Sequence, residues 1–318
     1  MLSAQILPSS AVSRRGFLSA AAAAGLLLGP AVAAQIVEVA YAGSMAPLME
    51  GGLKAAAGRA LGLDLHGRAQ GASALAELIA GGSLRPDVFL SVTPGPMETV
   101  LASGHADRAL PIAHTEMVIA YSPRGRFASD FARAAAGGTP PWWEILQRPG
   151  CRFGRSDPAA DPQGRNIIFV LRLAEQVYRR PGLAARVLGP VQNPRQIFAE
   201  TMLEARLQSG QLDAAAAYRV QPGAFQIPYL RLPPAINLGG PLPAAANALR
   251  LDLSGHSYRP QPLVYYAAVL QPAPHPQAAA RLVAWLQAPE AQQILRRAAY
   301  DPPGDAAPLR RAPAPGSA

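Results

Sequence analysis

The sequence contains little cysteine, few aromatic residues and little charge. Cys151 is the only cysteine, which excludes an intramolecular disulfide and a cluster of thiolate metal ligands. The five histidines do not have the spacing of metal ligands. Charged residues make up only 15% of the chain, and its arginines are scattered rather than gathered into a basic run with interleaved aromatics. We therefore expect no nucleic-acid partner.

Long apolar runs are also absent after the N-terminal region. No later apolar stretch reaches the roughly 20 residues of a membrane-spanning helix, so a soluble body is expected. The length of 318 residues exceeds that of a typical domain, about 100–200 residues, and predicts two domains. The formal net charge of +9 would at most help to attract small anions.

The N-terminus has the pattern of an export signal. Arg14 and Arg15 precede an apolar run that starts at Phe17, and small residues end the segment near Ala33. A charged start, an apolar middle and a small-residue end are typical of a secretory signal peptide, and paired arginines are typical of its twin-arginine variant. We expect residues 1–34 to be removed, by the twin-arginine or the general route, leaving a periplasmic or extracellular protein.

After this segment, short apolar runs alternate with helical patterns. The predicted strands are 36–41, 63–66, 87–92, 116–121, 151–154, 213–218 and 263–270. The predicted helices after Ser73 include 142–146, 166–180, 196–209, 276–288 and 289–299. This alternation predicts βαβ units and a parallel sheet in an α/β fold. Residues 306–318, rich in proline and alanine, are predicted to form a flexible tail.

Two turns share one design, in which a strand is followed by glycine and serine and then by a helix. They are Gly43–Ser44 and Gly71–Ala72–Ser73. A helix start offers unpaired backbone N–H groups and a partial positive charge, which suit an anion. The alternative is that Ser44 and Ser73 are ordinary helix caps. Because both turns fall at the same edge of one sheet, we predict a small-anion site there.

Several short motifs follow one another in a recognisable order. The first half contains Ala42–Gly43–Ser44, Gly71–Ala72–Ser73 and Pro86–Asp87–Val88–Phe89. The second half continues with segments 157–165, 210–219, 232–239 and 273–276. Taken together, these motifs resemble the molybdate/tungstate-binding components of ABC transporters over nearly all of the mature chain.

The resemblance implies the fold of a type II periplasmic binding protein. That fold has two α/β domains with a ligand cleft between them, joined by two crossing strands. On this basis, residues 35–115 plus 270–305 form domain 1, and residues 116–269 form domain 2. The anion is expected in the cleft, at the carboxyl ends of the strands.

The resemblance also implies which residues bind the anion. They are Ser44 and Ser73 from one domain and Asp161 with the Tyr218 region from the other. The predicted site also includes their neighbours Gly43, Ala72 and Arg219. Arg165 and Arg219 carry guanidinium groups that can add charge-assisted hydrogen bonds. Arg219 has the alternative role of a surface residue or a partner of Asp213. Thr93, which follows a predicted strand, offers one further hydroxyl.

Asp161 has three possible roles. In some members of the family, an aspartate in the Asp-Pro-x-Gly segment and a glutamate before a Tyr-Arg pair coordinate the metal, but Ala217 stands at the position of that glutamate here. A carboxylate repels an oxyanion unless it binds the metal centre, is protonated or pairs with a cation. Asp161 is therefore a direct ligand of molybdenum or tungsten, is held off the anion by Arg165 or Arg219, or caps the next helix. Tetrahedral and expanded coordination both remain open.

The function implied is non-enzymatic and needs no cofactor. The protein would capture molybdate or tungstate as a monomer and deliver it to the permease of an ABC transporter. Alternatives on the same fold bind sulfate, phosphate, a small organic acid or iron. An enzyme-class alternative is a secreted serine hydrolase with Ser73 as nucleophile, since Gly71–Ala72–Ser73–Ala74–Leu75 begins the Gly-x-Ser-x-Gly pattern but lacks its last glycine.

Overall fold

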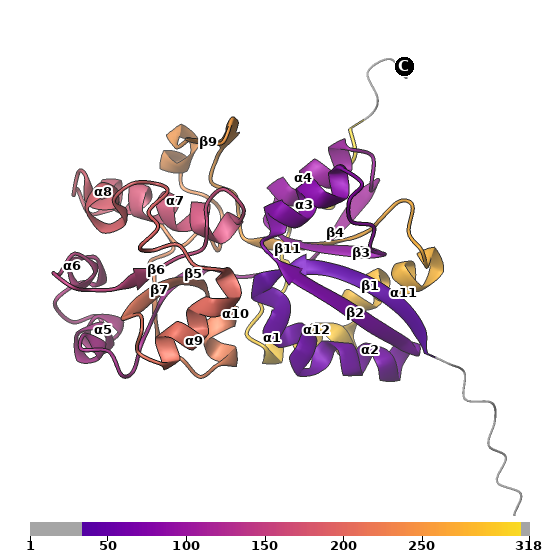
Figure 1. Cartoon of the computed structure of the whole chain (residues 1–318), viewed down its shortest axis with the longest axis horizontal. Coiled ribbons are helices and arrows are strands. Elements are labelled where there is room, and N and C mark those ends of the chain that lie inside the picture. Colours follow the sequence, from indigo (N-terminus) through magenta and orange to yellow (C-terminus); the bar gives the residue numbers. More distant parts are fainter. Residues whose placement is uncertain (1–33, 313–318) are drawn as a thin grey trace, which may run out of the picture. The chain divides into compact units, whose positions relative to one another are not determined.

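The computed structural model describes residues 34–312. The predicted signal segment lies outside the described residues except for Ala34, and so do residues 313–318. The described chain builds two main sheets, each with its own helices (Figure 1). We call the six-stranded sheet with its helices the first lobe, and the four-stranded sheet with its helices the second lobe.

The sheet of the first lobe is mixed. Its strands, in spatial order, are β12 (Leu309–Arg310), β4 (Arg108–His114), β11 (Val264–Val269), β3 (Val88–Val92), β1 (Gln35–Ala42) and β2 (Leu63–Gln70). The parallel arrangement predicted from the sequence holds for β1 with β2 and β3, whereas β11 runs antiparallel to β3 and β4. Every residue of β3 is buried, as expected of a central strand that is covered on both faces.

Helices cover both faces of the first sheet. They are η1 (Gly43–Met45), α1 (Ala46–Leu48), η2 (Met49–Leu53), α2 (Lys54–Leu61), α3 (Ala72–Ala80), α4 (Pro94–Ala102), α11 (Pro276–Leu286) and α12 (Pro289–Arg297). α3 and α4 lie on one face, while α2 and α12 lie on the other (Figure 1). Proline stands at the start of α4, α11 and α12, where its missing N–H has no partner to lose.

The second lobe contains a smaller sheet. Its strands are β6 (Phe153–Gly154), β7 (Ala214–Tyr218), β5 (Met117–Tyr121) and β8 (Tyr229–Arg231), in that order. Its helices are α5 (Ala128–Ala135), α6 (Trp142–Leu146), α7 (Pro162–Val177), α8 (Leu183–Leu188), η3 (Glu200–Met202), α9 (Leu203–Gln208), α10 (Val220–Ala224) and η4 (Ala244–Ala248). The helix predicted at 196–209 is thus limited to η3 and α9. A hairpin of β9 (Leu251–Leu253) and β10 (His256–Tyr258) stands apart from both sheets.

The side chains of β7 alternate between two apolar clusters. Ala216 and Tyr218 face the cluster that includes α7, whereas Ala215 and Ala217 face a cluster with Leu203 of α9. This two-residue period is that of a strand covered on both faces. α7 and α9 accordingly lie on opposite sides of the sheet (Figure 1).

The chain crosses between the lobes twice, at 115–116 and at 259–263. The crossings are joined by a hydrogen bond from the Thr115 N–H to the Leu263 carbonyl at 3.0 Å. After the second crossing, β11 pairs with β3 and β4 in the first lobe. The sequence predicts that the second domain ends at residue 269. In the structure, residues 264–269 already belong to the sheet of the first lobe, so the boundary lies earlier, before residue 264.

The predicted tail is partly ordered. Residues 309–310 form β12, which pairs antiparallel with β4 at the end of the first sheet. The Arg311 N–H also donates to the Asp107 carbonyl at 2.9 Å. The prediction of a flexible tail is wrong for this part, because backbone pairing with an open sheet edge outweighs the local propensity of a proline-rich sequence.

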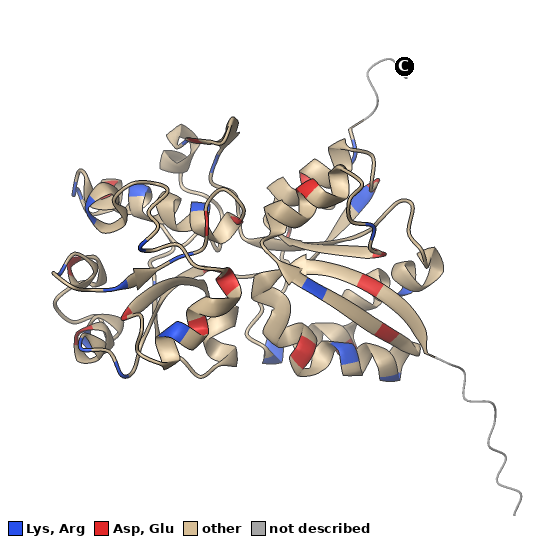
Figure 2. Cartoon of the chain, in the orientation of Figure 1, with Lys and Arg blue, Asp and Glu red and all other residues tan. Residues whose placement is uncertain are grey.

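No helix among residues 34–312 is long and apolar enough to cross a membrane. Figure 2 shows basic and acidic residues interspersed along both lobes. This matches the scattered arginines of the sequence.

Candidate functional site

The Gly43–Ser44 turn follows directly after β1. Ser44 is 1% exposed and lies inside η1, so its hydroxyl does not cap a helix. The Tyr265 hydroxyl donates to Ser44 Oγ at 3.1 Å, and the Tyr300 hydroxyl donates to the Ser44 carbonyl at 3.3 Å. Two buried tyrosines therefore fix the position of this turn.

The Gly71–Ser73 turn lies directly against the second lobe. A Cβ at Gly71, the N-cap residue of α3, would lie 2.8 Å from the Ala160 carbonyl oxygen. The Ala74 N–H donates to that same carbonyl at 3.2 Å. Glycine is required here because any larger residue would separate the lobes. Ala72, the next residue along, is 1% exposed.

Asp161 begins α7 from the second lobe. Its Oδ1 accepts the Gln163 backbone N–H at 3.0 Å, so the predicted capping role is present. Its Oδ2 is buried and has no hydrogen-bond partner among the described residues. Burial raises the pKa of Asp161, although the Gln163 N–H and the charge of Arg165 act in the opposite direction.

Three candidate hydroxyls share one hydrogen-bonding arrangement. Each accepts from a neighbour: Ser44 from Tyr265 at 3.1 Å, Ser73 from Arg165 at 2.5 Å, and Tyr218 from Asn166 at 3.1 Å. A hydroxyl that accepts in this way keeps its own hydrogen free to donate. Burial raises the pKa of Tyr218 well above its ordinary value, which keeps this hydroxyl protonated. All three groups are therefore set as donors.

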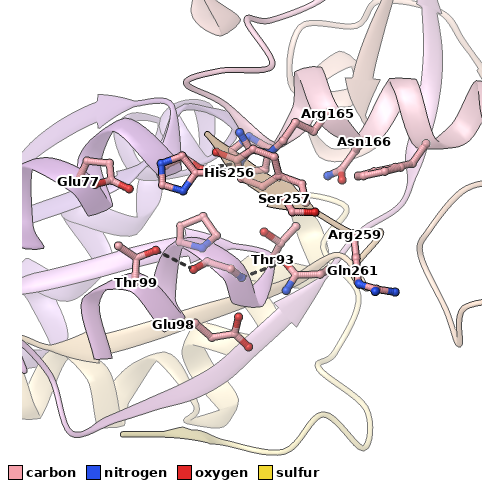
Figure 3. Close-up of a pocket in the computed structure, with 16 residues that line it drawn as sticks. Glu77, Thr93, Glu98, Thr99, Arg165, Asn166, His256, Ser257, Arg259 and Gln261 are labelled. Atoms are coloured by element: carbon pink, nitrogen blue, oxygen red, sulfur yellow. Dashed lines mark hydrogen bonds between the residues drawn. The ribbon is translucent and has the colours of Figure 1, made fainter. Parts of the chain in front are cut away.

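Several cavities lie where the lobes meet, and two of them are lined both by the Gly71–Ser73 turn and by the start of α7. The first, about 490 Å³, is lined by Gly43, Ala69, Gln70, Gly71, Ala74, Ser156, Asp157, Ala160, Asp161, Ile197, Phe198, Ala199, Glu200 and Thr201. The second, about 350 Å³, holds Ser73, Thr93, Arg165 and Asn166 among its lining residues (Figure 3). The N-terminal turns of α3 and α7 contribute to both, so the structure brings the predicted turns and Asp161 to one region.

The second cavity contains a residue with an unusual backbone. Thr93 has φ 70° and ψ 152°, a region that residues with a side chain rarely adopt. Figure 3 shows Arg165 and Asn166 of α7 across from Thr93 and Thr99 of the first lobe. The Arg165 guanidinium also lies 4.1 Å from the centre of the Tyr258 ring, and this cation–π contact helps to hold it beside Ser73.

The family model for bacterial extracellular solute-binding proteins matches residues 37–301. The chain belongs to this family. A Haloferax volcanii protein named as an ABC transporter molybdenum-binding protein is 32% identical over 244 residues, covering 74% of this chain and 75% of that protein. The molybdate/tungstate-binding protein WtpA of Pyrococcus abyssi is 26% identical over 219 residues, covering 62% of each.

Solved structures share the fold of this solute-binding protein. The periplasmic molybdate-binding protein of Azotobacter vinelandii aligns with a TM-score of 0.55 at 17% identity, covering 83% of this chain and 98% of that chain. The alignment spans both lobes, and the type II periplasmic binding protein fold expected from the sequence is confirmed.

Sequence reasoning missed one acidic residue of this solute-binding protein. Glu200, 7% exposed, lines the first cavity beside Gly43 and Asp161. Burial raises the pKa of Glu200 well above its ordinary value, and the charges of Asp161 and Glu204 raise it further. Its position between the apolar residues Phe198–Ala199 and Met202–Leu203 is the one signal in the sequence that pointed to a buried carboxyl.

Several positions singled out in the sequence do not line either cavity, namely Ser44, Ala72, Ala217, Tyr218 and Arg219. The Arg219 guanidinium pairs with Glu116, Nε to Oε1 at 3.3 Å, and with Asp301. The alternative pairing of Arg219 with Asp213 is wrong, because Asp213 bonds to Arg152 at 2.9 Å. Ala217 faces the apolar cluster of α9. A glutamate there would point into that cluster, because neighbouring strand residues face opposite ways.

Proposed function

We propose that this solute-binding protein captures molybdate or tungstate outside the cytoplasm for uptake by an ABC transporter. The observation that carries the proposal is a set of three hydroxyls that we call polarised donors. Ser44, Ser73 and Tyr218 each accept a hydrogen bond from a neighbouring side chain and keep their own hydrogen to donate. Such donors suit a fully ionised oxyanion, which can only accept hydrogen bonds. The names of the relatives supply the identity of the anion.

Capture works by joining the lobes. The turns at Gly43–Ser44 and Gly71–Ser73 belong to the first lobe, whereas Asp161 and Tyr218 belong to the second. An anion that is bonded to both favours the closed arrangement, because only that arrangement supplies contacts from both sides. We propose that the permease recognises the closed form of the monomeric protein. No bond of the anion is made or broken by this process.

Asp161 gives the site a preference among anions. Its buried Oδ2 has no hydrogen-bond partner among residues 34–312, and in its ionised form Asp161 would repel the oxygens of sulfate or phosphate. The central atom of molybdate or tungstate, in contrast, accepts additional oxygen ligands. We propose that Asp161 Oδ2 faces this atom while Oδ1 continues to cap α7, so that Asp161→Asn lowers affinity for molybdate more than for sulfate.

The hydrolase alternative requires a base that takes a proton from Ser73. The hydrogen-bond partner of Ser73 Oγ is instead the Arg165 guanidinium, which donates only and stays charged. This partner prepares Ser73 to donate to an anion and opposes its use as a nucleophile. The site therefore favours binding over hydrolysis.

The iron alternative would use tyrosines as phenolate ligands. Tyr218, Tyr265 and Tyr300 are all buried, and burial raises the pKa of each hydroxyl. Loss of their protons is therefore unfavourable, and the same hydroxyls serve better as hydrogen-bond donors. This favours an oxyanion over a ferric ion.

Isothermal titration of the mature protein with molybdate, tungstate, sulfate and phosphate tests the proposal. We expect tight one-to-one binding of molybdate and tungstate, weaker binding of sulfate, and weaker binding still of phosphate, which carries a proton at neutral pH. Binding of a small organic acid or ferric ion with none of the four anions would contradict the proposed ligand while leaving the fold in place.

A further inference from the structure

Glu200 reaches from the second lobe to the anion-binding turn of the first. It begins η3, and its Oε2 lies so near Gly43 that a Cβ at that position would collide with it. The Ser44 backbone N–H faces this carboxyl and lowers its pKa, opposing the effect of burial. A side chain of the protein thus occupies the place where Ser44 would hold a ligand.

The other carboxyl oxygen is held by the second lobe. Gln163 Nε2 donates to Glu200 Oε1 at 3.4 Å, and Gln221 Nε2 donates to the same atom at 3.3 Å. Both glutamines are buried, at 0% and 2% exposure respectively. The Glu200 carboxyl therefore faces donors of both lobes at once, as a bound oxyanion would have to do.

We propose that Glu200 is an internal stand-in for the oxyanion, which occupies the Gly43–Ser44 turn in the empty protein and is displaced when the anion binds. This proposal rests on the proposed function. A carboxyl presents two oxygens on a planar carbon and so resembles one edge of an oxyanion. Its contacts to both lobes hold the empty protein closed in the same way as a ligand does.

The surroundings of Glu200 make this contact easy to replace. Asp161 lies beside it, and Glu204 belongs to the same chain segment, so its neighbours include two further carboxyls. Crowding buried carboxyls is unfavourable, and an incoming anion that moves Glu200 toward solvent relieves this crowding. Glu200 and Thr201 line a cavity, and the next residue, Met202, is 48% exposed. The segment that carries Glu200 therefore lies at the surface.

Internal occupancy lowers the apparent affinity. If the turn is free in only about one tenth of empty molecules, the measured dissociation constant is about tenfold larger than that of the free turn. Removing the stand-in should therefore tighten binding. This is opposite to the expectation for a residue that binds the anion directly, whose removal weakens binding, and the sign of the effect decides between the two roles.

The experiment is titration of molybdate into the full mature protein and three variants at position 200. Glu200→Ala removes the carboxyl, and Glu200→Asp withdraws it by one methylene from Gly43; both should lower the dissociation constant about tenfold. Glu200→Gln keeps the length and an oxygen acceptor, so it should stay within about threefold of the parent protein. Glu175→Gln changes another glutamate of the second lobe, whose Oε1 accepts the Ala184 N–H at 2.8 Å, and is the matched control that should leave affinity unchanged.

Thermal unfolding of each unliganded variant checks that it folds. If Glu200→Ala does not fold, Glu200→Asp still decides the test. Small-angle scattering should show the empty Glu200→Ala protein more open than the parent. Weaker or unchanged binding in both Glu200→Ala and Glu200→Asp would overturn the stand-in role, while molybdate binding by the parent would still support the proposed function. Failure of every protein, parent included, to bind any of the four anions would overturn the proposed function itself.

Discussion

Ser44→Ala offers a direct test of the polarised-donor arrangement. The substitution removes a hydroxyl that is 1% exposed and leaves the Tyr265 hydroxyl without its acceptor at 3.1 Å. A hydrogen bond to a charged group contributes about 1.5–3 kcal/mol. Since about 1.4 kcal/mol corresponds to a tenfold change, molybdate affinity should fall roughly ten- to hundredfold.

The partner substitution Tyr265→Phe separates the two hydroxyls. It removes the donor behind Ser44 but keeps the hydroxyl that contacts the anion, so its effect on affinity should be smaller, about threefold. Because Tyr265 acts through Ser44, the double variant should bind no more weakly than Ser44→Ala alone. This non-additivity is the signature of a chain of hydrogen bonds.

The assay is calorimetric titration of molybdate into the parent protein, both single variants and the double variant. Thermal unfolding without ligand accompanies it, because an unpaired buried hydroxyl lowers stability by about 1–3 kcal/mol. Strictly additive losses would show that Tyr265 contacts the anion independently. Unchanged affinity in Ser44→Ala would refute the reasoning altogether.

Three further predictions concern residues around the site. Burial raises the pKa of Glu204 from 4.5 to about 7, so its contribution to the free energy of unfolding is greatest below pH 4.5 and falls by up to about 3 kcal/mol as pH rises to 7. Urea unfolding of Glu204→Gln between pH 4 and 8 should lack this contribution, and a pH profile identical to that of the parent would contradict it. Arg219→Gln should lower the free energy of unfolding by about 1–3 kcal/mol, because Glu116 and Asp301 lose a partner. It should leave molybdate affinity within twofold, and a large loss of affinity would show that Arg219 binds the anion after all. Burial raises the pKa of the Cys151 thiol to about 12, so at pH 8 the native thiol should react with an aromatic disulfide reagent at least about tenfold more slowly than the unfolded thiol, and equal rates would show that it is accessible as the thiolate.

Much of the fold follows from local patterns. The β-branched run at 36–41 falls within β1, because β-branched residues favour strands. The apolar run at 263–270 surrounds β11, because a strand buried on both faces needs an unbroken apolar sequence. Proline marks the start of α11 and α12 for a purely local steric reason. The family could be predicted as well, because the order of the short turn motifs can be read directly along the sequence.

The pairing of strands from the two halves could not be predicted locally. Whether β11 runs parallel or antiparallel to β3 depends on where the chain returns after the second crossing. The partner of residues 309–310 is β4, about 200 residues earlier, so a proline-rich sequence gave no sign that it would be ordered. Contacts between distant segments depend on the packing of whole lobes, and a short stretch of sequence carries no information on that packing.

The same division applies to the site. The sequence by itself determined the two glycine–serine turns and the Asp161 cap, because a tight turn and a helix start each depend on a few adjacent residues. Only the tertiary structure decided that Tyr265 and Arg165 stand behind the two serines, that Arg219 is held by Glu116 and Asp301, and that Glu200 reaches Gly43. The physical reason is that hydrogen bonds and carboxyl interactions act over a few ångströms in space, whatever the separation of their residues along the chain.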